Sequence, residues 1–277
     1  MLLQEPEGVL VVPDGPPCAA VLVLSGSSGR VERDRARLLA SRGAAALSIR
    51  WFGGPGQPPG ICEVPLDTFR PALDRLLALH ARLTVLGISK GAEAALLLGT
   101  RDPRVRAVVA LSPTSVVWAN VGPGRDGADH PYRSSWTADG RPLPFVPYDD
   151  DWTVPEAGPA VAYRAMYESS LARFGDRVAA ARIPVELIAG PVLVSGGGDD
   201  QLWPSDRFAR EIAEARAARG LTTRLITSPA AGHLVLLPGE PEVGPRAGFA
   251  YGGSPPADRS IGERVLSELS KLLPLRA

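Results

Sequence analysis

The chain has 277 residues, and its 30 basic residues balance its 30 acidic residues, so the formal net charge is zero. This balance, without a basic block, argues against nucleic acid or an anionic membrane as the main partner. There is no window of about 18 apolar residues, no signal-peptide pattern, and only two cysteines, Cys18 and Cys62, so we expect a reducing, cytoplasmic setting.

Strand-like and helix-like segments alternate along most of the chain. Short apolar runs predict strands at 8–12, 19–24, 44–49, 83–88, 105–111, 192–195 and 222–227. Helical periodicity predicts helices at 31–42, 65–80, 90–99, 158–174, 205–219 and 261–273. Apolar strands that alternate with helices predict a single α/β domain over 1–277, with a mostly parallel sheet covered by helices on both faces.

Residues 112–157 interrupt this alternation. They are rich in Pro, Gly and Asp, and residues 112–170 hold eight of the 16 aromatic residues of the chain. A long segment of this kind is either a disordered insertion or a partly ordered lid over a pocket. Because aromatic residues are unusual in disordered segments, we expect a lid or cap over 112–174. A second loop rich in Pro and Gly, 238–256, follows His233.

A nucleophile elbow is the strongest local motif. Gly87-Ile88-Ser89-Lys90-Gly91 matches G-x-S-x-G between an apolar strand and a helical pattern. Glycines on both sides of the serine let the backbone pack tightly while the serine Oγ is presented at the turn. Backbone N–H groups at the start of the helix can stabilise an oxyanion. The pattern predicts Ser89 as a nucleophile, whereas an ordinary tight turn is the alternative.

A serine nucleophile needs a base, and His233 is the best placed of three histidines, because it lies between the strand at 222–227 and the final helix. His80 and His130 suit solvated positions. In α/β-hydrolases the acid lies between the serine and the histidine in sequence. Asp199 and Asp200 compete for this role, and Pro204 four residues later favours Asp200, which leaves Asp199 to accept backbone hydrogen bonds or cap the helix.

The remaining predicted site residues surround this triad. The Lys90 and Ser27 backbone N–H groups are the expected oxyanion donors, with Ser27 in the small-residue loop 25–29. Aromatic residues of the lid are candidates to line a substrate pocket, although core packing explains them equally well: Trp118, Trp136, Trp152, Tyr163 and Tyr167. Three arginines could meet phosphates or be solvated: Arg125, Arg133 and Arg141. We expect no cofactor and no metal, since no His/Cys cluster has ligand spacing.

The motifs resemble the C-terminal catalytic domain of the acyl-CoA thioesterase / bile acid-CoA:amino acid N-acyltransferase family, which is similar to dienelactone hydrolases. The segments that carry the resemblance are 51–54 (WFGG), 64–69 (VPLDTF), 86–93 (LGISKGAE), 197–203 (GGDDQLW), 231–234 (AGHL) and 251–255 (YGGSP). The resemblance implies an α/β-hydrolase domain whose nucleophile, acid and base correspond to Ser89, Asp200 and His233.

Two departures from the family affect the expected activity. Only about 18 residues precede the first core strand, whereas the animal enzymes carry an N-terminal β-sandwich domain, so substrate recognition by that domain is not transferred. The nucleophile is serine, whereas the amino-acid-conjugating branch uses cysteine, and this favours hydrolysis. We therefore expect a serine hydrolase that cleaves a small-molecule acyl thioester.

Several alternatives stay open at this point. The triad also suits a carboxylic ester or lactone hydrolase, or an acyltransferase to a small amine or alcohol, and a non-catalytic scaffold would retain the same residues. Lysine is rare here, with 28 arginines against Lys90 and Lys271, so a lysine directly after Ser89 is a residue to test.

Overall fold

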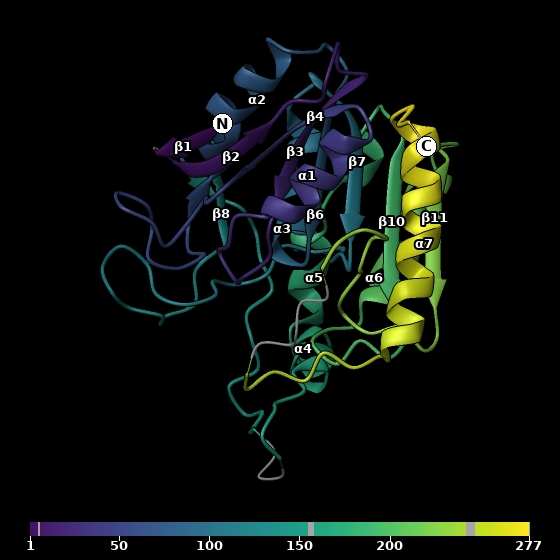
Figure 1. Ribbon diagram of the computed structural model, residues 1–277. Helices are drawn as coiled ribbons and strands as arrows, with labels where there is room; N and C mark the ends of the chain where they lie inside the picture. Colours follow the sequence, from purple (N-terminus) through teal and green to yellow (C-terminus); the bar gives the residue numbers. More distant parts are fainter. Residues whose placement is uncertain (5, 155–157, 242–246, 277) are drawn as a thin grey trace.

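A computed structural model describes residues 1–4, 6–154, 158–241 and 247–276 of the protein. A sheet of eight strands forms the centre of this part of the chain, in the order β1-β2-β4-β3-β6-β7-β10-β11. Figure 1 shows the sheet with helices on both sides and with most of the irregular segments beyond one end of it. In this order, the six strands β4, β3, β6, β7, β10 and β11 are parallel to one another, whereas β1 and β2 form an antiparallel edge.

The central strands lie where the apolar runs predict them. Strands β3 (Ala19–Leu24), β4 (Ala44–Ile49) and β6 (Leu83–Ile88) are buried at every position. Strands with helices on both faces bury both of their faces, which is why they appear as continuous apolar runs. The other strands of this sheet are β1 (Leu2–Gln4), β2 (Glu7–Val11), β7 (Val105–Leu111), β10 (Val192–Gly197) and β11 (Thr223–Ser228).

Two apolar cores lie on opposite faces of the sheet. On one face, side chains of α2 (Arg70–Leu77), α3 (Lys90–Arg101) and α6 (Ser205–Ala217) pack with alternate strand residues. On the other face, α1 (Arg33–Ser41) and α7 (Pro255–Leu272) cover the sheet. The predicted α/β architecture with helices on both faces is therefore confirmed.

Three predicted helices differ from the structure by more than two residues at one or both ends. The helix predicted at 65–80 is a 3₁₀ turn, η1 (Leu66–Phe69), followed by α2. The one predicted at 158–174 is α4 (Arg164–Arg173), which begins six residues later than predicted. Val161, which precedes α4, forms an isolated β-bridge with Phe249 instead of helix. The last helix begins at Pro255 rather than at residue 261, because prolines fit the first turn of a helix.

The segment between β7 and β10 contains order that the sequence did not indicate. Strand β8 (Trp136–Ala138) pairs with both β5 (Val64–Pro65) and β9 (Arg141–Pro142) in a small second sheet. Helix α5 (Gly175–Ala181) and the 3₁₀ turn η2 (Val185–Leu187) lead back to the main sheet. In Figure 1 much of this teal and green segment lies beyond the carboxyl ends of the central strands, the end at which Ser89 follows β6.

Candidate active site

Ser89 occupies the turn between β6 and α3 in a strained conformation. Its backbone φ is +57° and its ψ is −124°, in a region that side-chain-bearing residues rarely adopt. Such a conformation costs about 1–3 kcal/mol and persists only where the surrounding structure holds it. The Ser89 N–H donates to the carbonyl of Leu111 on β7 at 3.0 Å, and this bond fixes the turn to the neighbouring strand.

The glycines of the elbow are required by close backbone packing. A Cβ atom at residue 87 would lie 2.0 Å from the carbonyl oxygen of Gly91. A Cβ atom at residue 91 would lie 2.4 Å from the carbonyl oxygen of Ser25. Both distances are shorter than any real contact, so only glycine allows helix α3 to start this close to β6 and to the loop after β3.

Asp200 and His233 form a buried pair at the carboxyl ends of β10 and β11. Oδ2 of Asp200 lies 2.8 Å from Nδ1 of His233, and both residues are almost fully buried. The other carboxylate oxygen, Oδ1, accepts the backbone N–H groups of Leu202 and Trp203 at 2.9 and 3.2 Å. The carboxylate is thus fixed from two sides, and it can orient the imidazole through Nδ1 while Nε2 is left for another partner.

The loop that carries His233 is held by partners from three other segments of the chain. Oγ of Ser112 donates to the His233 carbonyl at 2.7 Å, and the His233 N–H donates to the Tyr251 carbonyl at 2.9 Å. The buried Asp258 of α7 accepts the N–H of the preceding residue, Gly232, at 2.8 Å. Burial raises the pKa of Asp258, and the charges of neighbouring carboxylates add to this effect.

Asp199 points to a different partner from Asp200. Its carboxylate accepts the backbone N–H of Gly253 at 2.8 Å and the side-chain amide of Gln201 at 2.8 Å. The structure therefore brings Asp200, and not Asp199, to the histidine, and it gives Asp199 the backbone hydrogen bond that was the alternative for it.

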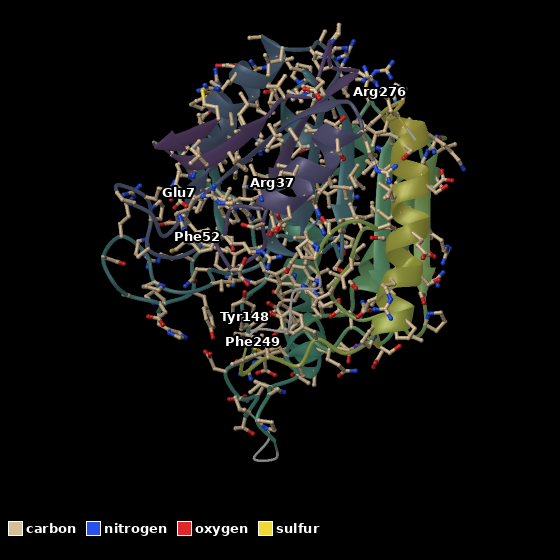
Figure 2. All side chains as sticks on the ribbon, viewed as in Figure 1. Glu7, Arg37, Phe52, Tyr148, Phe249 and Arg276 are labelled. Atoms are coloured by element: carbon tan, nitrogen blue, oxygen red, sulfur yellow. The ribbon has the colours of Figure 1, made fainter. Side chains whose placement is uncertain are left out.

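Ser89 and His233 line one cavity of about 380 Å³. The loop after β3 lies against the serine, since a Cβ at residue 26 would be 3.4 Å from Ser89 Oγ. Ser27 of that loop and Lys90, the two residues predicted to supply the oxyanion donors, also line the cavity. Other lining residues come from the segment after β7 and from the loop before α7, and Figure 2 labels one of each, Tyr148 and Phe249.

Two of the predicted pocket aromatics, Tyr163 and Tyr167, line this cavity. Trp118 and Trp136, by contrast, are fully buried and do not line it, contrary to the prediction. Trp118 lies behind Tyr167, with ring centroids 4.7 Å apart, while Trp136 stacks on the core residue Trp51 at 5.2 Å. Trp152 does not line the cavity either, and its ring packs against that of Tyr163 with centroids 5.8 Å apart.

Lys90 and Glu93 form a second buried pair in the first turn of α3, directly after Ser89. Nζ of Lys90 lies 2.5 Å from Oε2 of Glu93 and 2.8 Å from Oγ of Ser135. Oε1 of Glu93 accepts the Trp118 backbone N–H at 3.1 Å and the Trp136 indole N–H at 2.9 Å. Burial lowers the pKa of Lys90 and raises that of Glu93, and each charge partly offsets the effect on the other.

Sequence reasoning missed Glu93, although it singled out Lys90. The i, i+3 spacing is the only local signal for this pair, and most such pairs are solvated. The partners of Glu93 come from a segment that carries no clear periodicity, so the sequence does not indicate that the pair is buried. Ser112, Trp203 and Asp258 were missed as site residues for the same reason.

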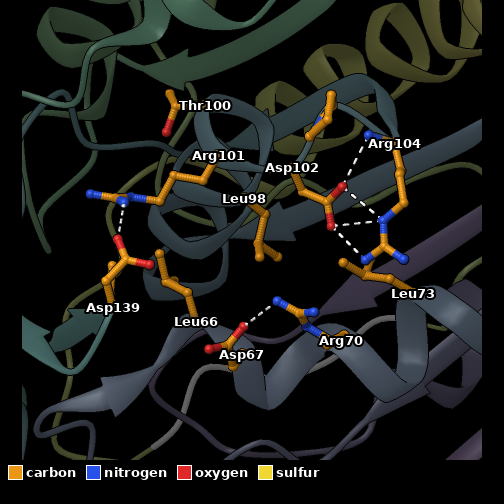
Figure 3. A pocket seen from close by; sticks show the side chains of 12 residues that line it. Leu66, Asp67, Arg70, Leu73, Leu98, Thr100, Arg101, Asp102, Arg104 and Asp139 are labelled. Atoms are coloured by element: carbon orange, nitrogen blue, oxygen red, sulfur yellow. Dashed lines mark hydrogen bonds and ion pairs between the residues drawn. The ribbon is translucent and has the colours of Figure 1, made fainter.

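A larger cavity, of about 550 Å³, lies away from Ser89, between η1 and the end of α3. Figure 3 shows that its arginines are paired with aspartates: Arg70 with Asp67, Arg101 with Asp139, and Arg104 with Asp102. Its charges therefore balance, and its lining residues include no serine, cysteine or histidine. This cavity holds no nucleophile next to a base, so it is not the candidate active site.

The remaining predicted residues lie at the surface or in ion pairs. His130 is exposed at the edge of the cavity, while Nδ1 of His80 accepts the Arg82 N–H at 3.0 Å. Arg133 pairs with Asp126 at 3.0 Å, Arg125 contacts the Gly56 carbonyl, and Arg141 is exposed on β9. In the described ranges we find no group of three His, Cys, Asp or Glu residues arranged to hold a metal ion. None of the helices in these ranges has the length and apolar character needed to span a membrane.

Solved structures define the class of the fold. A Mycobacterium tuberculosis puromycin-hydrolyzing peptidase superposes with a TM-score of 0.57 and 15% identity over 96% of this chain and 37% of that chain. A Klebsiella pneumoniae protein assigned as a dienelactone hydrolase superposes with a TM-score of 0.52 and 15% identity over 97% of this chain and 92% of its own. The mostly parallel sheet, flanked by helices and with an elbow after β6, is an α/β-hydrolase fold.

Residues 69–259 match the family described as BAAT / Acyl-CoA thioester hydrolase C terminal, and the chain belongs to this family. Rat acyl-coenzyme A amino acid N-acyltransferase 2 is 28% identical over 241 residues, which cover 84% of this chain and 53% of the relative. Mouse acyl-coenzyme A thioesterase 6 is 28% identical over 228 residues, which cover 78% of this chain and 48% of the relative. The chain thus spans about half the length of these relatives.

Proposed function

We propose that the protein is a serine hydrolase that cleaves an acyl thioester through Ser89, His233 and Asp200. The observation that carries this proposal is the buried 2.8 Å contact between Asp200 and the Nδ1 atom of His233, at the same cavity as Ser89. The strained φ of Ser89 supports it further, because strain at a non-glycine residue is typical of functional sites. The thioester substrate is inferred from the family and from the names of the relatives.

In the proposed mechanism, Ser89 Oγ attacks the acyl carbonyl while Nε2 of His233 accepts its proton. Asp200 holds the imidazole in the tautomer with the proton on Nδ1 and stabilises the imidazolium. The Lys90 and Ser27 N–H groups donate to the oxyanion, and each such donor contributes about 3 kcal/mol at comparable sites. The thiolate then leaves, with His233 available to return a proton to it, and a water molecule attacks the acyl-enzyme with His233 as the base.

The segment 112–174 is proposed as the cap that forms the acyl-binding side of the cavity. It contributes Asn120, Tyr148, Tyr163 and Tyr167 to the lining. Acyl transfer to an amine is the second candidate, because the rat relative is named as an N-acyltransferase. Both reactions pass through the same acyl-enzyme and differ only in the acceptor that attacks it.

Labelling with a fluorophosphonate probe tests the nucleophile. We expect an adduct on Ser89 in the wild-type protein and none in Ser89→Ala, which should fold normally and lose at least about 10³-fold in thioester turnover. A Ser28→Ala control, which changes an exposed serine of the neighbouring loop, should still be labelled. An unlabelled, folded wild-type protein would contradict the proposal.

Separate measurement of thiol and free acid distinguishes the two reactions. Hydrolysis releases one free acid for each thiol without any added amine. If thiol release requires glycine or another amine and yields no free acid, the transferase is the correct assignment.

A further inference from the structure

The cavity beside Ser89 gathers aromatic side chains from segments that are far apart in the sequence. The protein has five tyrosines, and all five line this cavity, together with Trp203 and Phe249. They come from segments as far apart as residues 132 and 251. Core packing alone would distribute tyrosines over both faces of the sheet, so this concentration indicates a ligand that interacts with ring faces and edges.

The aromatic wall begins next to the proposed base. The Trp203 ring lies 5.8 Å from the His233 imidazole in an edge arrangement, and the Tyr251 ring lies 6.0 Å from it. A carbonyl that reaches Ser89 and His233 therefore has rings beside the first atoms of its acyl chain. An aromatic ring one or two bonds from the carbonyl would meet these rings directly.

The wall is fixed before any ligand binds. Tyr167 makes edge contacts with Trp118, Tyr148 and Trp203, with centroids 4.7, 5.6 and 5.5 Å apart. The Tyr148 hydroxyl donates to the Ala119 carbonyl at 3.1 Å, and the Trp118 indole N–H donates to Thr114 Oγ1 at 2.9 Å. A rigid wall favours a rigid, planar group, because neither side loses much conformational freedom on binding.

The charges of the lining favour a neutral acyl group. Burial raises the pKa values of Tyr148 and Tyr167, so their hydroxyls stay protonated. The Lys90 ammonium is paired with Glu93, and among the described lining residues there is no arginine. Apart from the proposed base His233 and the other tyrosines, Asp129 and His130 are the remaining ionisable residues of the described lining, and both are exposed.

The volume of the cavity sets the size of the group. At about 380 Å³ it lies near the lower end of the range of roughly 300–1,000 Å³ for small-molecule sites. A compact ring fits such a volume, and so does a straight chain of the same carbon number, so the volume limits the size of the acyl group and the ring contacts carry the selectivity.

We propose that the protein selects compact, neutral aromatic acyl groups, of the size of phenylacetyl, over straight-chain acyl groups. The ring lies against Tyr167, Trp203 and Tyr251, and the carbonyl lies at Ser89. This assignment of the substrate class rests on the proposed function of the same site.

Three thioesters of N-acetylcysteamine, matched in carbon number and leaving group, test the proposal: the phenylacetyl, cyclohexylacetyl and octanoyl esters. We expect kcat/KM for phenylacetyl to exceed that for octanoyl by about tenfold, as two or more ring–ring contacts would give, with cyclohexylacetyl between them. An octanoyl ester that is cleaved as well as phenylacetyl, or better, overturns the proposal.

Binding to Ser89→Ala separates this proposal from the mechanism. Calorimetric titration with the same three esters should give the tightest Kd for phenylacetyl. If the wild-type protein cleaves none of the esters but the variant keeps this order, the proposed function fails and the acyl class stands. If the variant binds octanoyl equally well, the acyl class is wrong whatever the protein catalyses.

Substitution of one ring locates the selectivity. Tyr167→Leu should lower the ratio of phenylacetyl to octanoyl kcat/KM by at least about threefold, because it removes one aromatic contact. Phe145→Leu is the matched control: Phe145 lies under Arg177 at 5.7 Å and does not line the cavity, so the ratio should not change. An equal change in both variants, or no change in Tyr167→Leu, overturns the placement of the ring.

Discussion

Two buried acid–base pairs flank Ser89, and they differ in what remains available on each. In the pair of Asp200 and His233, the carboxylate occupies only the Nδ1 atom of the ring, and the histidine lines the cavity. In the pair of Lys90 and Glu93, the ammonium also binds Ser135, and the carboxylate also accepts two N–H groups. The first pair leaves the Nε2 atom of the imidazole available to accept and return a proton. In the second pair the ammonium and both carboxylate oxygens already have hydrogen-bond partners, so this pair holds segments of the chain together.

The comparison assigns the two pairs to different properties of the molecule. Changes in the first pair should lower activity with little effect on folding, since its carboxylate geometry can be kept by an amide. Changes in the second pair should lower stability, because it joins α3 to the segment after β7. The free energy of burying two charges makes the removal of a single partner costly.

The largest effect is expected for Asp200→Asn. The amide oxygen can keep the hydrogen bonds from Leu202 and Trp203, but the amide no longer stabilises the required tautomer and imidazolium of His233. We expect kcat to fall by about 10⁴-fold with less than about 1 kcal/mol change in the free energy of unfolding. Thioester kinetics and urea unfolding measure the two quantities. An Asp200→Asn variant that retains wild-type activity would contradict the distinction between the two pairs. Asp199→Asn is the control, and its turnover should stay far above that of Asp200→Asn.

Lys90→Met should instead act on stability. It leaves the Glu93 carboxylate fully buried without its cation, which typically costs about 3–5 kcal/mol. Urea unfolding measures this loss, and kcat per folded molecule should change by less than about tenfold because the backbone N–H of residue 90 is kept. The double variant Lys90→Met/Glu93→Leu should be less unstable than the sum of the single variants. Additive losses would show that the two residues do not act as a pair.

A smaller loss is expected for Lys90→Arg. The Lys90 side chain is 2% exposed, so a larger, planar guanidinium must displace its neighbours, which costs about 1–3 kcal/mol. The activity of the folded protein should persist, because the oxyanion donor proposed at this position is the backbone N–H, which the substitution keeps. A drop of more than about tenfold in kcat with unchanged stability would show that the ammonium contributes to the chemistry. Lys271→Arg, at an exposed position, is the control for the same substitution.

The smallest effect concerns the pH dependence of stability. Burial raises the pKa of Asp258 in the folded protein, so the folded state holds this proton more tightly than the unfolded state does. Stability then falls as the pH rises through the folded pKa, since the charged form is penalised. Asp258→Asn can still accept the Gly232 N–H without this penalty. We expect a higher Tm than wild type at about pH 8, with the advantage lost towards about pH 4. A lower Tm at both values would contradict this sign.

The sequence predicted the sheet well because its strands are short apolar runs that are buried on both faces. Strands β3, β4, β6 and β7 have the predicted bounds. The spacing of Gly87, Ser89 and Gly91 similarly identified the elbow, because steric packing leaves no other residue at either glycine. Sequence patterns therefore predicted the elements whose structure is determined by contacts between residues close in the sequence.

Long-range contacts account for what the sequence did not predict. Strand β8 pairs with residues Val64 and Pro65, about seventy positions earlier, and has no periodicity of its own. Trp118 and Trp136 were placed in the pocket because aromatic residues of a lid commonly line one. Instead, Trp118 donates its backbone N–H and Trp136 its indole N–H to the buried Glu93. A single sequence does not reveal which polar group these N–H groups will meet.

The attachment of Trp136 has a consequence for chimeric proteins. Exchanging the proposed cap between relatives is a natural way to test its role in substrate preference, and the end of β7 and the start of β10 are the obvious splice points. Here the segment after β7 carries Ser135 and Trp136, whose side chains hydrogen-bond to the charged groups of Lys90 and Glu93 on α3. A graft that replaces this segment but keeps Lys90 and Glu93 would leave two buried charges without their hydrogen-bond partners. The transferable unit therefore includes the first turn of α3.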